Sequence, residues 1–78
     1  MKIVRRIGVS PRARGSLSGS NCPDMFELSD GNFAVIGTEA TATLESELPA
    51  DASCGADERI VIVSRETVLR AKADIPDA

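Results

Sequence analysis

The chain has 78 residues, of which 42% are hydrophobic and 3% aromatic, and its formal net charge is −3. A chain of this length forms one small domain with a thin core, so we expect a protein partner or self-association to add stability. It contains no His and no Tyr, and the absence of His removes the commonest general base and the commonest zinc ligand besides Cys. We therefore expect no enzyme, no catalytic residue, no metal or other cofactor, and no small-molecule substrate.

Charge is divided unevenly along the sequence. Residues 1–23 carry five basic residues and no acidic one, whereas residues 24–78 have a net charge of −8. Residues 10–21 are rich in Ser, Gly and Arg, and too polar to fold on their own. We predict a flexible basic arm over residues 1–21 and a folded domain over residues 22–78, with residues 3–9 as a further edge strand in an alternative interpretation. The candidate contacts to an acidic partner or to nucleic acid are Arg5, Arg6, Arg12 and Arg14.

Two further expectations concern location and the thiols. No apolar run approaches the ~18 residues that a membrane span needs, and no signal-peptide pattern is visible. We therefore expect a cytoplasmic protein that makes no membrane contact. In that compartment Cys22 and Cys54 are most simply free thiols, with a disulfide and a thiol redox function as alternatives.

The folded domain is expected to begin with a β-hairpin over residues 24–37, DMFELSDGNFAVIG. Asp30-Gly31 suits a two-residue type I′ turn, which would pair Leu28 with Phe33. This register places both phenylalanines on one face of the hairpin. The opposite, mixed face contains the candidate interaction residues Met25, Ala34 and Ile36.

Three elements are predicted after the hairpin. Residues 38–48 have apolar residues at helical spacing before Pro49, with an extended path over residues 38–44 as the alternative. The β-branched run at residues 60–63 predicts a central strand covered on both faces. Ser64 is a candidate N-cap for a final helix whose Val68, Leu69 and Ala73 would face the sheet. The order ββαβα predicts an α+β fold with a small, mainly antiparallel three-stranded sheet and one or two short helices.

The residues Cys22-Pro23-Asp24-Met25-Phe26-Glu27, followed by Gly31-Asn32-Phe33-Ala34-Val35-Ile36-Gly37, form the pattern C-P-x-x-[FY]-E and then G-x-[FY]-x-V-x-G. This pattern resembles that of a family of small uncharacterised actinobacterial proteins. The resemblance covers residues 22–75 and implies no catalytic residues. It implies a regulatory accessory role, since such proteins accompany helix-turn-helix regulators.

These observations favour a non-enzymatic interaction module that is regulatory and binds a protein partner or itself. Two alternatives stay open. One is a nucleic-acid-binding accessory protein that uses the basic arm, and the other is a thiol redox protein.

Overall fold

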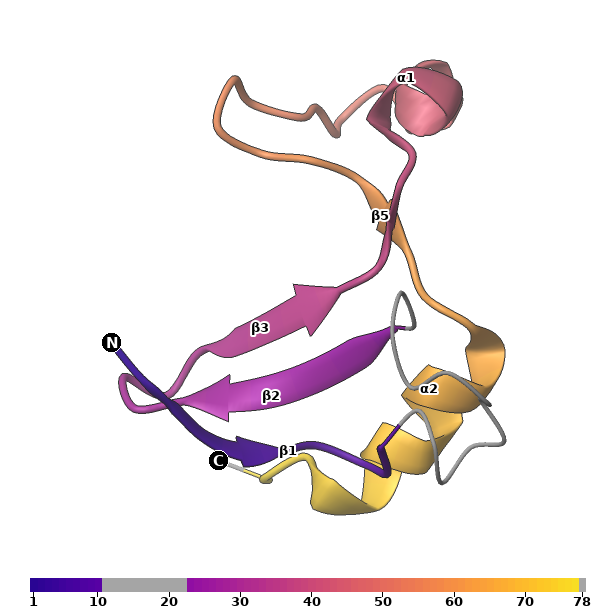
Figure 1. The fold of residues 1–78 in the computed structure, drawn as a ribbon. Helices are drawn as coiled ribbons and strands as arrows, with labels where there is room; N and C mark the ends of the chain where they lie inside the picture. Colours follow the sequence, from indigo (N-terminus) through magenta and orange to yellow (C-terminus); the bar gives the residue numbers. More distant parts are fainter. Residues whose placement is uncertain (11–22, 78) are drawn as a thin grey trace.

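The hairpin and the N-terminal strand form the main sheet of the protein. The computed structural model describes residues 1–10 and 23–77, and Figure 1 shows its fold. Strands β1, β2 and β3 form an antiparallel sheet in that order, and β4 and β5 form a second, two-stranded sheet. The predicted α+β class and the three-stranded antiparallel sheet are confirmed. The elements are β1 (Ile3–Arg6), β2 (Asp24–Leu28), β3 (Phe33–Ile36), β4 (Thr38–Glu39), α1 (Thr41–Leu44), the 3₁₀ helix η1 (Glu45–Glu47), β5 (Val61–Ile62), α2 (Arg65–Ala71) and the 3₁₀ helix η2 (Lys72–Asp74).

The turn between β2 and β3 has three residues instead of the predicted two. Leu28 N–H donates to the Asn32 carbonyl at 2.9 Å, so the loop consists of residues 29–31. Gly31 has a φ of 90°, the left-handed conformation that ends a three-residue hairpin loop. The Asp30 carboxylate accepts the Asn32 N–H at 3.0 Å and holds the loop. The register is therefore shifted by one residue from the predicted one, and Phe33 pairs with Glu27.

The third strand of the sheet comes from the N-terminus. Residues 3–6 form β1 and pair antiparallel with β2, with a bulge between Ile3 and Arg5. The alternative with a further edge strand is thus the one observed, over a shorter range. Part of the predicted arm, strand β1, thus belongs to the three-stranded sheet. The rest of the predicted arm, residues 11–21, lies outside the described residues, as does residue 22.

Strand β5 is not the predicted central strand. It pairs only with β4, and Val61 and Ile62 are 38% and 49% exposed. The two strands approach closely because Gly37, just before β4, has no side chain. A Cβ at this position would lie 2.6 Å from the Ile62 carbonyl oxygen.

The predicted helix over residues 38–48 is divided into an extended and a helical part. Thr38 and Glu39 are extended in β4, and the helical turns α1 and η1 follow. Neither Thr38 nor Thr41 caps the helix: the N-cap is Ala40, without a side-chain hydrogen bond. The Thr41 hydroxyl instead accepts the Ile60 N–H at 2.8 Å. This bond closes the base of a lobe, residues 40–60, that rises away from the three-stranded sheet in Figure 1.

Helix α2 begins at the predicted cap but presents a different face. The Ser64 hydroxyl accepts the Thr67 N–H at 3.1 Å, which confirms the N-cap. Thr67 and Ala71 are buried, one turn apart, whereas Val68 and Leu69 are exposed. The prediction that Val68, Leu69 and Ala73 face the sheet is wrong, and Ala73 is exposed as well. Small residues face inward because the backbone at Gly8 passes against the helix: a Cβ there would lie 3.2 Å from the Ala71 nitrogen.

The core between helix and sheet is very small. The apolar side chains that the described residues bury are Ile7, Ala40 and Ala71, and the buried polar ones are Asp24 and Thr67. Asp74, the last residue of η2, links this helical segment to the chain just after β1, because its carboxylate accepts the Gly8 N–H at 2.8 Å. In the described part of the chain, no helix has the length and apolar character needed to cross a membrane.

Candidate interaction surface

The observed register divides the predicted interaction residues between the two faces of the sheet. Residues directly opposite in an antiparallel pair lie on the same face. Met25 is opposite Val35, and Ala34 is opposite Phe26. Ala34 and Ile36 therefore share one face, and Met25 lies on the other. The predicted surface made of these three residues does not exist as one patch.

The same shift separates the two phenylalanines. Phe33 lies on the Met25 face and Phe26 on the Ala34 face, so the predicted aromatic cluster is absent. The 3₁₀ helix η2, which continues α2, lies against the Met25 face, since the Arg5 guanidinium on that face donates to the Asp74 carbonyl at 2.8 Å. Phe33 and Val35 lie on this face but remain 42% and 43% exposed. The helix therefore leaves the outer strand of its own face uncovered.

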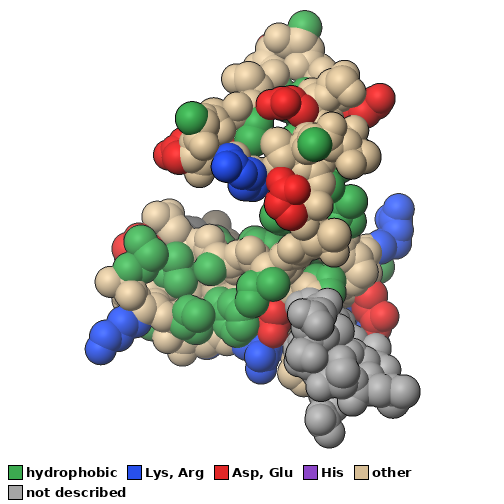
Figure 2. Space-filling model, turned by 45° about the horizontal axis from the view of Figure 1, so that its top comes forward, with side chains coloured by type: hydrophobic (Ala, Val, Ile, Leu, Met, Phe, Trp, Pro, Cys, Tyr) green, Lys and Arg blue, Asp and Glu red, His purple; other side chains and the backbone are tan. Residues whose placement is uncertain are grey.

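Exposed apolar side chains continue beyond β3. Figure 2 shows hydrophobic side chains gathered over the part of the molecule that the sheet forms. It also shows a hollow between this part and the lobe above it. The large apolar side chains that are exposed in the described part of the chain are Met1, Ile3, Val4, Phe33, Val35, Ile36, Val61, Ile62, Val68, Leu69 and Ile75. Within this set, Phe33 and Val35 lie next to each other on one face of β3, and exposed apolar side chains that are grouped in this way are typical of an interaction surface.

The described arginines of the predicted arm are engaged within the protein. Arg6 forms a bidentate ion pair with Asp24, with N–O distances of 3.0 to 3.2 Å. The Arg5 Nε donates to Glu27 at 2.7 Å. Both guanidiniums hold β1 to β2 and are only partly available to an external anion. The other two candidates, Arg12 and Arg14, lie outside the described residues.

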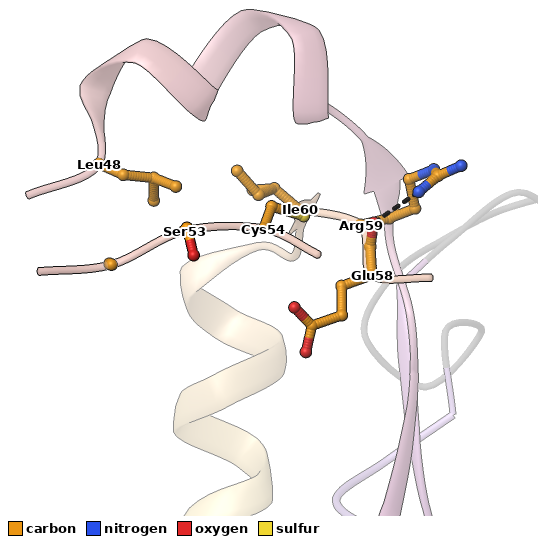
Figure 3. Close-up of a pocket in the computed structure, with 7 residues that line it drawn as sticks. Leu48, Ser53, Cys54, Glu58, Arg59 and Ile60 are labelled. Atoms are coloured by element: carbon orange, nitrogen blue, oxygen red, sulfur yellow. Dashed lines mark hydrogen bonds between the residues drawn. The ribbon is translucent and has the colours of Figure 1, made fainter. Parts of the chain in front are cut away.

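A shallow pocket of about 440 Å³ lies within the lobe and includes one thiol. Figure 3 shows Cys54 beside Ile60, with Leu48 facing them and the Arg59 side chain turned away. Cys54 is a free, half-buried thiol, and Cys22 lies outside the described residues. The Glu58 carboxylate accepts the Gly55 N–H at 2.7 Å and closes the turn that follows Cys54. These neighbours make the pocket a partly apolar hollow with no basic side chain directed at the sulfur.

No metal site is assembled in the described residues. Among residues 1–10 and 23–77, no three side chains of the types His, Cys, Asp and Glu come together to hold an ion. The acidic residues of the lobe are spread over its surface instead. Residues 40–60 contain five acidic residues and one basic residue, a net charge of −4.

The sequence predictions did not identify the outer edge of β3 as the unpaired edge of the sheet. The signal for it was present, because Gly at the third loop position suits a three-residue turn as well as Asp-Gly suits a two-residue one. In comparisons with protein-family models, curated proteins and solved structures, the chain matches none.

Proposed function

We propose that the chain is a non-enzymatic interaction module, regulatory in role, that binds a protein partner or a second copy of itself. One observation carries the proposal, the imbalance between buried and exposed apolar side chains. Three apolar side chains are buried in the described part of the chain, against at least eleven large ones that are exposed. Such an imbalance is typical of a domain whose surface is completed by another molecule.

The energies involved support this reading. Fully burying a Val, Ile or Phe side chain contributes roughly 1.5–3 kcal/mol, so covering one that is half exposed contributes about 1 kcal/mol. Covering Phe33 and Val35, which lie on the same face of β3, would add about 2 kcal/mol. The core of a domain this small rarely supplies more than ~3–5 kcal/mol. A partner on this surface would therefore raise the stability of the domain substantially.

The chemistry of the chain supports binding over catalysis. It has no His or Tyr, and the Glu58 carboxylate that lines the Cys54 pocket is engaged by the Gly55 N–H. The nucleic-acid alternative gains no support from the described residues, because Arg5 and Arg6 are already paired with carboxylates. The described residues therefore favour an interaction module over a nucleic-acid-binding protein and over a thiol redox protein.

The test combines self-association with partner capture. Sedimentation velocity over a wide range of concentrations measures oligomers of the full chain, and crosslinking in the native cell identifies a partner. The proposal expects either a concentration-dependent oligomer or one saturable partner that thermally stabilises the domain. A strict monomer at all concentrations, together with no crosslinked partner above a bait-free control, would contradict it.

A further inference from the structure

The backbone of β3 has an unused edge, which follows from the hydrogen-bond pattern. Leu28 N–H donates to the Asn32 carbonyl, which makes these two residues a hydrogen-bonded pair of the hairpin. Bonded and non-bonded pairs alternate along an antiparallel ladder. Residues 34 and 36 therefore bond to β2. The N–H and C=O groups of Phe33 and Val35 point the opposite way, out of the sheet.

The other side of the hairpin agrees with this pattern. Met25, the partner of Val35, has its carbonyl engaged by the Ile7 N–H at 2.8 Å on the β1 side. β3 is the last strand of its sheet, and in the described part of the chain nothing pairs with its outer edge. Phe33 and Val35 thus leave two donors and two acceptors unpaired. Such a row is a template for another strand.

The side chains of β3 contain none of the usual protection against pairing. Edge strands are commonly blunted by Lys, by Pro or by inward-pointing charges. The four residues of β3 are Phe, Ala, Val and Ile, without a charge. Three of these four side chains are exposed. The edge is therefore chemically suited to an apolar extended segment.

The surroundings of the edge select the charge of the occupant. The lobe rises on the β3 side of the sheet (Figure 1), and the hollow in Figure 2 lies between them. The lobe has a net charge of −4 over residues 40–60. Glu45, Glu47 and Asp51 are exposed there and have no ion-pair partner among the described residues. Arg59 is the one basic residue of the lobe, so the excess charge of the lobe is negative, and an occupant with basic ends would meet complementary charge.

We infer that the free edge of β3 is a strand-addition site for an extended segment of a protein partner, with apolar residues at alternate positions and Lys or Arg at its ends. The segment would exchange four backbone hydrogen bonds with Phe33 and Val35 and cover their side chains. This inference rests on the proposed function and names the class of partner.

The test uses a display library of random linear peptides, panned on the immobilised full chain. The expected sequences have alternating apolar residues, basic ends and no central Pro. A selected peptide is then synthesised with N-methylation at a residue whose N–H faces β3, and as a matched control at the next residue. The first modification should weaken binding about five- to tenfold per lost hydrogen bond, and the control should not.

Two variants test the same edge from the side of the protein. Val35→Pro removes an N–H that β2 does not use, so the hairpin ladder is kept. Val35→Thr retains the N–H and serves as the control. Circular dichroism checks that both are folded, and the peptide should bind Val35→Thr much more tightly than Val35→Pro. If Val35→Pro does not fold, the N-methylated peptides on the unaltered chain decide the matter.

The outcomes separate the inference from the proposed function. A peptide that binds regardless of N-methylation and of Val35→Pro would overturn the strand-addition site and leave the interaction module standing. A dimer that Val35→Pro disrupts, and with which no peptide competes, would assign the edge to a second copy and overturn the inference. No selected peptide, no cellular partner and no oligomer would overturn both.

Discussion

Removing the Arg6 guanidinium should destabilise the domain far more than removing an exposed arginine. The Asp24 side chain is only 7% exposed, and its carboxylate accepts hydrogen bonds from both Nε and Nη2 of Arg6. Without Arg6, the remaining donor to this carboxylate among residues 1–10 and 23–77 is the backbone N–H of Met25, at 3.0 Å. Arg6 also lies 5.3 Å from the centre of the Phe26 ring. The substitution Arg6→Ala thus leaves a buried carboxylate without its counter-charge.

The magnitude follows from the burial of each partner. Breaking a fully buried ion pair costs about 3–5 kcal/mol. The Arg6 side chain is 41% exposed, so water can partly replace it, and we expect a loss of about 2–3 kcal/mol. This is roughly half of the ~3–5 kcal/mol that a domain this small has available. Arg6→Lys keeps the positive charge but cannot form the bidentate ion pair, so this variant should lose about 1–2 kcal/mol of stability.

The assay is urea unfolding followed by circular dichroism, since the chain has no Trp or Tyr for fluorescence. The matched control is Arg70→Ala. Arg70 pairs with Glu66 at 3.3 Å, and both side chains are more than half exposed. Exposed pairs one helical turn apart contribute about 0.3–0.5 kcal/mol. If Arg6→Ala loses no more stability than Arg70→Ala, the structural role assigned to Arg6 is refuted.

Three further changes have defined outcomes. Gly37→Ala would place a Cβ 2.6 Å from the Ile62 carbonyl oxygen, so thermal unfolding should show a loss of about 1–3 kcal/mol, and an unchanged melting temperature would contradict the close approach. Ser64→Ala removes the N-cap acceptor of α2 and should lower stability by about 1 kcal/mol in urea unfolding, whereas Ser64→Asp should retain most of it. Hydrogen bonds from the Thr41 side chain and backbone N–H, aided by the nearby positive charge of Arg59, hold the pKa of Glu39 below its ordinary 4.5. This contribution is present above pH 4.5 and is lost as pH falls through the lowered pKa, so acid titration should destabilise the unaltered chain more than Glu39→Gln; equal losses would count against the bond.

The final helix could be predicted because its signals are local. Ser64 is an N-cap type, and Glu66 and Arg70 suit the two ends of a helix. Which side of the helix is buried could not be read in the same way. The inward position of Ala71 depends on the close approach of Gly8, more than sixty residues earlier in the chain. Contacts of this kind leave no trace in the spacing of apolar residues.

The hairpin could be predicted as an element but not in register. Asp30-Gly31 suits a two-residue turn and also the end of a three-residue one, and the local sequence does not decide between them. The choice has large consequences, because a shift of one residue moves the side chains of β3 to the opposite faces. Met25 and Ile36 were expected together for this reason and are in fact apart.

The pairing of β5 depended on a partner too short to recognise. Ile60 to Val63 is strongly β-prone, and a continuous run of this kind usually indicates burial on both faces. The observed partner, β4, has only two residues, Thr38 and Glu39, and both are polar. Propensity gave the strand but could not give its neighbour, and therefore gave the wrong exposure.

Backbone amide exchange, measured by nuclear magnetic resonance on the full chain with and without the selected peptide, tests the central claim most directly. In the free protein, Ala34 and Ile36 should exchange slowly, since they bond to β2, and Phe33 and Val35 should exchange rapidly. Saturating peptide should slow the exchange of Phe33 and Val35 specifically. Protection of these two amides in the free chain, or their unchanged exchange in the saturated complex, would contradict the account.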